Sequence, residues 1–361
     1  KICTGKLTMS KKNIILIVLS LVVIGVAVSA AYQRWQLKQG ARTAPPPGVA
    51  LEIENMALAA DLPSGFMVWS SNRFGNHDIL RMDLPGREVT RLTSHPHTEY
   101  YPRISPDGSK IVFSRSQKPW VSQRNTEPWD VVLLDIQSGE ETVLAKNGNT
   151  PTWSADGKKV YFQNDVVNFT EVDVETGEQK VLFTSGRGEV KQGVVLYTPN
   201  YNAKTGKLAV TQHIGDYMAT IVDMNGTIQK IGYGCQINWN RNGDILYYVG
   251  HGGKQKNAFY RYDARSGNYS KWLDLPGEFS HEYFPKLSNN EKYLVFAASK
   301  SGHEHDTADY EIFLWQAGTP ATSAVRLTYH TGNDNWPDIY LRDSGLSLLQ
   351  TGKPGPTMAG R

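Results

Sequence analysis

The chain has 361 residues, of which 40% are hydrophobic and 20% charged, and its formal net charge is +3. Its 33 glycines and 18 prolines are typical of a turn-rich all-β domain, and one such domain can occupy most of this length. No run of basic residues is interleaved with aromatic ones, which argues against nucleic acid as a partner. The two cysteines, Cys3 and Cys235, are far apart in the sequence, and we expect no internal disulfide.

The N-terminal part of the chain predicts a segment that inserts into a membrane. Residues 1–8 precede the first methionine, Met9, and we interpret them as an upstream read-through. Residues 14–31 carry no charge over 18 positions, which is close to the lower length limit of a membrane span and longer than most signal-peptide cores. Two interpretations remain open: an uncleaved signal anchor over residues 13–32, or a signal peptide cleaved after residues 28–30.

The orientation follows from the short segment before this apolar run. Such a segment usually stays inside, so we expect residues 1–12 in the cytoplasm and most of the chain on the other side. Residues 33–65 predict a tether, because the run of three prolines at residues 45–47 is stiff and extended. The expected localisation is therefore the inner membrane with the folded domain in the periplasm, or the periplasm alone if the segment is cleaved.

From residue 66 onward the sequence repeats a strand–turn–strand unit. The clearest copy predicts strands at residues 101–105 and 110–114, joined at Asp107-Gly108. Asp-Gly is favoured in type I′ turns, where both central residues have positive φ. Aligned on Pro102, further copies have anchor positions at residues 151, 199, 237, 285 and 337, with spacings of 38 to 52 residues. A period of this length with several short strands per repeat indicates a β-propeller.

We therefore predict an all-β fold, a six-bladed β-propeller over residues 66–342. The first blade lacks an innermost strand at its start, and the missing strand is predicted at residues 335–341. A C-terminal strand would thus close the ring and leave no open sheet edge. Residues 343–361 are expected to form a C-terminal tail.

Four segments carry a resemblance to a known family: residues 69–76 (Trp-Ser-Ser-Asn-Arg-Phe-Gly-Asn), 78–83 (Asp-Ile-Leu-Arg-Met-Asp), 90–93 (Thr-Arg-Leu-Thr) and 105–108 (Ser-Pro-Asp-Gly). With these segments, residues 66–342 resemble the TolB-type propellers, whose repeats read Ser-Asn-Arg, Glu-Ile-Tyr, Leu-Thr and Trp-Ser-Pro-Asp-Gly. The resemblance implies a six-bladed, extracytoplasmic protein–protein interaction module.

The chain also departs from that family. TolB carries a separate α/β domain before its propeller, whereas only the tether precedes the repeats in this chain, so the partner-binding N-terminal segment of TolB is not expected. The same repeat occurs in propellers fused to peptidases and in a polysaccharide-lyase family. The fold alone therefore does not settle the function.

Irregular loops and histidines are predicted to gather on one face of the propeller. Strand direction alternates within a blade, so short turns such as Asp107-Gly108 lie on one face and the long connections lie on the other. All nine histidines fall on the irregular face. Loops on a rigid scaffold collect binding residues, and aromatic side chains beside arginines and carboxylates are typical of interface hot spots.

The predicted partner- or ligand-binding residues on this face are His95, His97, Glu99, Tyr100, Trp120, Arg124, Trp129, His281, Glu282, Tyr283, His303, His305, His330, Asp334 and Trp336. A second interpretation stays open for them. Such groups can instead cap strand ends and bond to neighbouring blades, and Tyr100 and Tyr283 can pack between blades.

No cofactor is expected, with a divalent metal as the alternative. Imidazoles with carboxylates nearby are suitable metal ligands, although no fixed spacing motif joins them. The candidate ligands are His95, His97, His281, His303 and His305.

The sequence contains no nucleophile elbow, no His-Glu-x-x-His and no Walker loop, so no catalytic residues are assigned. The leading hypothesis is a membrane-tethered scaffold that presents its loop-rich face to a protein or peptide of the bacterial cell envelope. The alternative is a metal-dependent enzyme of the polysaccharide-lyase kind, or another propeller enzyme, with its site at the channel mouth.

Overall fold

The computed structural model describes residues 62–342, apart from residues 215, 252–256, 301, 303 and 330. The expected cytoplasmic segment, membrane anchor, most of the tether, the C-terminal tail, His303 and His330 lie outside the described residues. Every described residue belongs to one compact unit. No helix in this described part of the chain has the length and apolarity needed to cross a membrane.

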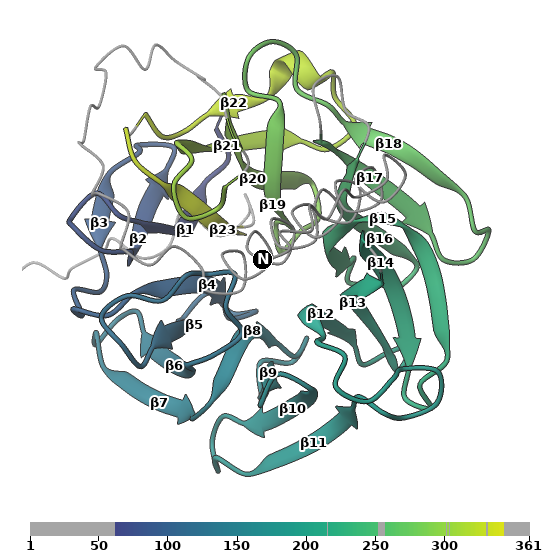
Figure 1. Cartoon of the computed structure of the whole chain (residues 1–361). Helices are drawn as coiled ribbons and strands as arrows, with labels where there is room; N and C mark the ends of the chain where they lie inside the picture. Colours follow the sequence, from purple (N-terminus) through teal and green to yellow (C-terminus); the bar gives the residue numbers. More distant parts are fainter. Residues whose placement is uncertain are drawn as a thin grey trace, which may run out of the picture. The chain divides into compact units, whose positions relative to one another are not determined.

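Antiparallel β-sheets make up the regular structure of the described residues, with one short 3-10 turn at Ala321–Ser323. Four sheets have four strands and one has seven, and Figure 1 shows them arranged around a common centre as in a propeller. This arrangement confirms the all-β propeller prediction. The count of six blades is not confirmed, because one sheet has seven strands.

Three of the four-stranded sheets follow one another along the chain, and in each the first strand named lies nearest the centre. The first sheet contains β23 (Asp334–Leu341), β1 (Gly65–Ser71), β2 (Asp78–Leu84) and β3 (Val89–Arg91). The second contains β4 (Glu99–Ile104), β5 (Lys110–Ser116), β6 (Trp129–Asp135) and β7 (Glu141–Ala145). The third contains β8 (Gly148–Trp153), β9 (Lys159–Asn164), β10 (Asn168–Asp173) and β11 (Gln179–Thr184).

The remaining strands form two sheets. The seven-stranded sheet contains β12 (Tyr197–Asn202), β13 (Lys207–Ile214), β14 (Asp216–Asp223), β15 (Ile228–Trp239), β16 (Ile245–His251), β17 (Asn257–Asp263) and β18 (Tyr269–Leu273). The last sheet contains β19 (His281–Leu287), β20 (Tyr293–Ser299), β21 (Tyr310–Gln316) and β22 (Val325–Arg326).

The C-terminal strand closes the ring as the sequence predicts. β23 pairs antiparallel with β1, with Gly65 opposite Leu341 and Ser71 opposite Asp334. Seven of its eight residues are buried. The first sheet is therefore assembled from both ends of the described domain, and β1 has a partner on each side.

The seven-stranded sheet arises because one long strand changes partner. Residues 228–233 of β15 pair with β14, and residues 234–239 pair with β16. Gly234 stands at the change, with φ of +153°, and a Cβ on it would lie 2.1 Å from the Val249 carbonyl oxygen. Only glycine fits this backbone without displacing the neighbouring strand.

Gly234→Ala is therefore expected to lower the free energy of unfolding by about 1–3 kcal/mol, since it combines a strained φ with a backbone clash. Gly86→Ala is the matched control, because Gly86 is exposed and a Cβ there meets nothing within 4 Å. Denaturant melts of the two variants measure the difference. Equal stability of the two variants would show that β15 does not pass through Gly234 as described.

The Asp-Gly hairpins differ from the predicted type I′ turns. Gly108 has φ of +77° but Asp107 does not have positive φ, so only one of the two central residues is left-handed. The Asp107 carboxylate explains this, because it accepts hydrogen bonds at 2.5 Å from the Ser105 hydroxyl and at 3.1 Å from the Ser109 amide. The loop closes through the Ser105 amide and the Lys110 carbonyl, 2.8 Å apart. The side chain of Asp107 thus shapes a longer loop, and the type I′ prediction is wrong.

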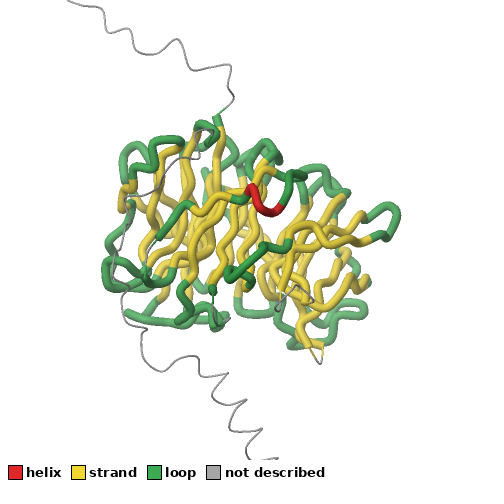
Figure 2. Tube along the Cα trace, turned by 90° about the horizontal axis from the view of Figure 1, so that it is seen from above, coloured by secondary structure: helices red, strands yellow, loops and turns green. Residues whose placement is uncertain are grey.

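Connections between strands fall on two opposite faces, as the edge-on view in Figure 2 shows. We call the two the loop face and the turn face. The loop face carries the connections β1–β2, β5–β6 and β20–β21 and those that join one sheet to the next. The turn face carries short turns such as residues 105–109. The hydrophobic core lies between adjacent sheets, for example where Val112 and Val131 meet Val160 and Phe162.

Candidate functional site

Six inner strands surround the centre of the domain: β4, β8, β12, β15, β19 and β23. Each contains one non-glycine residue with φ between +45° and +59°, at the same place as an interruption in its pairing. We call these residues the channel ring: Tyr101, Thr150, Thr198, Gln236, Phe284 and Trp336. All six line one narrow cavity of about 30 Å³. Such backbone strain costs about 1–3 kcal/mol per residue and clusters at functional sites.

The sequence carries a signal for this ring that the repeat pattern alone does not reveal. Five of the six residues directly precede a proline at an anchor position, and Gln236 precedes Ile237. A proline disfavours the right-handed helical conformation in the residue before it and cannot donate a hydrogen bond to a strand, so it is tolerated at bulges. The anchor positions predicted the inner strands, but not the positive φ of the residue that precedes each anchor.

A larger cavity of about 260 Å³ opens above the channel ring on the loop face. We call it the loop-face cavity. Its walls are rich in aromatic side chains: Tyr101, Tyr197, Tyr217, Tyr283 and Trp336. Arg124 is a charged group among them, and amide side chains from several strands supply hydrogen-bonding groups. An aromatic pocket with a few convergent polar groups is the usual form of a binding site.

Gln123 organises one wall of this cavity. Its side-chain oxygen accepts a hydrogen bond of 2.6 Å from the Trp336 indole, and its backbone carbonyl accepts one of 2.7 Å from the Tyr101 hydroxyl. Its side-chain amide donates to the His305 carbonyl at 2.7 Å. The connection β5–β6 is thereby held against two inner strands and against the connection β20–β21.

Ionic contacts reinforce the same junction. Arg124 Nε lies 2.7 Å from Glu304 Oε1. Asp306 is buried, accepts from the Gln123 amide at 3.1 Å and bonds to the Ser122 hydroxyl. Burial raises the pKa of Asp306, against the effect of these hydrogen bonds. The loops around the cavity are therefore cross-linked, which favours a preformed site.

The predicted site residues separate into four groups in the structure. Those that line the loop-face cavity are Arg124, Tyr283, His305 and Trp336. Those half-buried elsewhere are His95, His97 and Trp120. Those fully buried away from the cavity are Glu99, Tyr100, Trp129, His281, Glu282 and Asp334. The last two, His303 and His330, are not described. Gln123, Tyr217 and Asp306 were not predicted, because nothing in one sequence brings these connections together.

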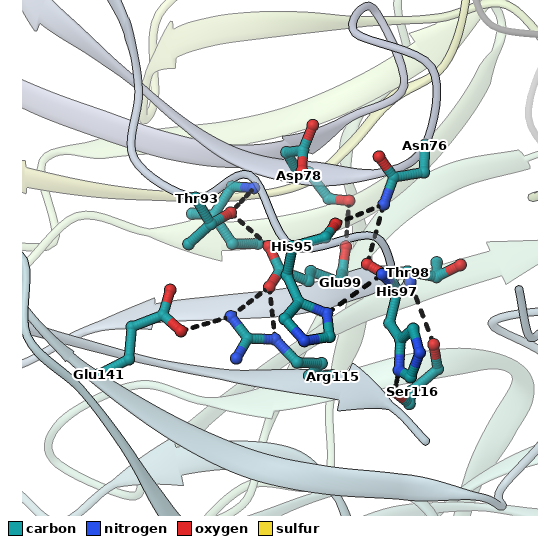
Figure 3. Close-up of polar contacts among 12 residues, drawn as sticks. Asn76, Asp78, Thr93, His95, His97, Thr98, Glu99, Arg115, Ser116 and Glu141 are labelled. Carbon is teal, nitrogen blue, oxygen red and sulfur yellow. Dashed lines mark hydrogen bonds and ion pairs between the residues drawn. The ribbon is translucent and has the colours of Figure 1, made fainter. Parts of the chain in front are cut away.

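Glu99 belongs to a buried polar cluster rather than to an open surface (Figure 3). Its Oε1 lies 2.6 Å from Arg115 Nη2, and its other oxygen accepts a hydrogen bond from the Thr93 hydroxyl. Arg115 also reaches Glu141, at 2.7 Å. Burial raises the pKa of Glu99 to about 7, although Arg115 and Thr93 oppose the shift. We call Thr93, Glu99, Arg115 and Glu141 the Glu99 cluster.

Hydrogen bonds fix the connection between β3 and β4 that contains His95 and His97 (Figure 3). The Asn76 side-chain amide donates to the His95 and His97 carbonyls at 2.8 and 2.9 Å. His97 Nδ1 lies 2.8 Å from the Ser116 carbonyl. Burial lowers the pKa of His95, with Arg115 adding to the effect. These contacts match the second interpretation of the sequence, in which the groups bond to neighbouring blades.

The Arg-Leu-Thr motif has the same structural use in two sheets. The Thr93 and Thr328 hydroxyls accept hydrogen bonds of 2.9 and 2.8 Å from the Ile79 and Ile312 amides. Arg91 lies 2.9 Å from Asp78, and Arg326 lies 2.6 Å from Glu311. In both sheets the threonine of the motif thus bonds to a neighbouring strand, and its arginine pairs with a buried carboxylate.

Metal binding stays a prediction. Among the residues that the structure describes, no three His, Cys, Asp or Glu side chains form a group that could hold an ion. His95 and His97 lie together, with ring centroids 4.7 Å apart. His305 packs its ring against Tyr283, at 4.6 Å between centroids, and contributes to the wall of the loop-face cavity.

Comparison with known proteins relates the chain to a group of propellers. No protein-family model matches the sequence. An uncharacterized protein of Agrobacterium fabrum is 30% identical over 102 residues, which are 26% of this chain and 35% of that protein. The chain thus covers about a third of the length of this curated relative.

Solved structures align over more of the chain. TolB from Acinetobacter baumannii has a TM-score of 0.56 at 16% identity, over 76% of this chain and 66% of that protein. A candidate TolB from Agrobacterium tumefaciens has a TM-score of 0.54 at 12% identity, over 76% and 91%. Hydrazine synthase from Kuenenia stuttgartiensis has a TM-score of 0.52 at 12% identity, over 77% and 47%. The described part of the chain therefore has the fold of the TolB-type β-propellers.

Proposed function

We propose that this domain is an extracytoplasmic scaffold that binds a protein or peptide of the bacterial cell envelope at its loop-face cavity. The observation that carries the proposal is the aromatic cavity itself, set at the mouth of the channel and walled by hydrogen-bonded loops. The fold shared with TolB proteins supports the same class of function by analogy.

The size and lining of the cavity favour an inserted segment over a flat contact. A volume of about 260 Å³ holds one or two large side chains. Aromatic anchors in a pocket surrounded by polar groups are typical of interface hot spots. Arg124 is half-buried and already paired with Glu304, so the cavity does not present a strong charge. A partner segment with an apolar or aromatic side chain suits it best.

We further propose that the domain works as six blades. Each of the six inner strands contributes one residue to the channel ring. β15 supplies the outermost strand of the blade that begins with β12 and the innermost strand of the blade that ends with β18. The boundaries proposed from the sequence remain residues 66–342 for the propeller and residues 33–65 for the tether. Anchoring through residues 13–32 rests on the sequence, as does the periplasmic location.

The metal-dependent enzyme of the polysaccharide-lyase kind stays the alternative hypothesis. No cluster of metal ligands among the described residues favours it.

Tyr217→Ala tests the binding proposal. Tyr217 lines the cavity and is 39% exposed, so its removal should leave the melt within about 1 kcal/mol of wild type. Capture of the partner that wild-type protein crosslinks in native membranes should weaken about 30-fold, as expected for a hot spot worth about 2 kcal/mol.

Tyr269→Ala is the matched control, because Tyr269 is 68% exposed and lies on the outer strand β18. It should change neither the melt nor the capture. Equal loss of capture in both variants, or loss only with Tyr269→Ala, would contradict the proposed site.

A further inference from the structure

A second cavity of about 260 Å³ opens at the other end of the channel, on the turn face. We call it the turn-face cavity. It is formed by the last residues of the inner strands and the turns that follow them, and its walls include Trp153, Tyr201, Trp239, Tyr247 and Tyr340. A cavity at this position is not expected from the sequence, because the turns on this face are short.

Polar residues follow the anchor position in every inner strand. They are Arg103, Thr152, Asn200, Asn238, Lys286 and Asp338, one from each strand. Three of the six are ionisable, and Lys286 and Asp338 line the turn-face cavity directly. Arg103 lines the narrow cavity next to it, and Asn200 lines both. The charges of Arg103, Lys286 and Asp338 influence one another, so the three side chains lie close together in the channel.

Backbone amides already donate hydrogen bonds to both oxygens of the Asp338 carboxylate. Asp338 Oδ2 accepts from the Ile104 amide at 2.8 Å, and Oδ1 accepts from the Ile339 amide at 3.0 Å. Arg103 Nη1 donates to the Pro102 carbonyl at 2.7 Å and to the Pro337 carbonyl at 3.4 Å. Asp338 therefore forms no direct ion pair with either cation among the described residues.

Lys286 is the ionisable residue of the three that remains available to bind a ligand. Within the described part of the chain its ammonium has no hydrogen bond or ion pair, although it is half-buried in the cavity. Burial lowers the pKa of Lys286 to about 8, the nearby charge of Arg103 adds to this, and Asp338 opposes it. Two cations face one carboxylate, which leaves one uncompensated positive charge. Further out, Lys204, Arg241 and Glu291 also line the cavity.

We propose that the turn-face cavity is a second binding site, for a small organic monoanion with an apolar body, whose carboxylate contacts the Lys286 ammonium. The Lys286 ammonium, which has no partner among the described residues, matches a monoanion, and its three N–H donors suit a carboxylate. The aromatic walls suit a flat apolar body, and the volume limits the ligand to a small molecule. The site is independent of the proposed function, since it uses the opposite face.

Calorimetric titration of the full chain tests the site, with benzoate as the probe and the uncharged, isosteric benzamide as its control. Benzoate should bind, and benzamide should bind at least tenfold more weakly. Lys286→Met, which removes the ammonium but keeps most of the unbranched stem, should weaken benzoate binding at least tenfold. Lys180→Met, on the outer strand β11 away from the cavity, should change it less than twofold. Equal binding of the two probes, no binding of benzoate, or full affinity in Lys286→Met would overturn the proposal.

A measurement on the wild-type chain covers the case in which Lys286→Met does not fold. At pH 8 an amine with a pKa near 8 is about half neutral, whereas an ordinary lysine is less than about 1% neutral. The neutral amine attacks the ring of trinitrobenzenesulfonate, sulfite leaves and the amine proton passes to solvent. Peptide mapping should show that benzoate, but not benzamide, slows this labelling of Lys286 at least fivefold. Unchanged labelling in saturating benzoate would overturn the proposal.

Discussion

Truncation of the chain before residue 334 is expected to abolish cooperative folding of the propeller. The truncation removes β23, whose Trp336, Ile339 and Leu341 are buried in the largest hydrophobic cluster. Burial of such side chains contributes about 1.5–3 kcal/mol each, and the backbone bonds to β1 are lost with them. The sum is comparable to the whole stability of a typical domain, about 5–15 kcal/mol. A circular-dichroism melt measures the result.

Truncation after residue 342 is the control, because it removes only the C-terminal tail and keeps β23 and its pairing. This shorter deletion should leave the cooperative melt in place. A protein without β23 that melts cooperatively at the wild-type temperature would contradict closure of the ring by this strand. Exposure of the β1 edge also predicts aggregation of the longer deletion.

Arg115→Met is expected to be the most damaging single substitution in the Glu99 cluster. It leaves the Glu99 carboxylate fully buried without its ion-pair partner, which typically costs about 3–5 kcal/mol. The pKa of Glu99 is raised to about 7 in the folded protein, so its protonated form is already favoured at low pH. The protonated Glu99 carboxyl therefore stabilises the folded protein fully below the pKa that Glu99 has in the unfolded chain. This contribution is lost as pH rises through about 7.

The pH dependence distinguishes this explanation from a packing defect. At pH 5 Glu99 is protonated in both proteins, so the loss of stability in Arg115→Met should be small. At pH 8 the loss should be large, and the added substitution Glu99→Gln should restore most of it. Glu141→Gln removes the outer, partly exposed partner of the same arginine and should cost less than about 1 kcal/mol. Equal losses in Arg115→Met at pH 5 and pH 8 would show that packing, not the buried charge, causes the damage.

The fold was predictable where its signals are local. Asp-Gly turns, alternating apolar residues and recurring anchors define hairpins over a few residues, and the closing strand follows from the count of those hairpins. The continuous β15 was not predictable, because Gly234 is as typical of a loop as of a strand that changes partner. The turn type at Asp107 was also missed, because it depends on the hydrogen bonds of the aspartate side chain.

The site was predictable only in part, for a related reason. Strand direction alone placed Arg124, Tyr283 and Trp336 on the loop face, where the structure has them in the wall of the loop-face cavity. Burial of Glu99 depends on packing between blades, which one sequence does not reveal. The turn-face cavity was not predicted because short turns suggested an inert face, although the polar residue after each anchor, such as Lys286, was visible in the sequence.

Site-specific photocrosslinking in native membranes tests the central claim, partner binding at the loop-face cavity, most directly. A photoreactive phenylalanine analogue is placed at Tyr217 in the loop-face cavity, at Ser138 on the turn face, or at Tyr269 on an outer strand. All three side chains are exposed, so each position should tolerate the change. We expect one defined crosslinked envelope protein from position 217 and none from positions 138 and 269. A crosslink from position 138 or 269 alone would contradict binding at the loop-face cavity.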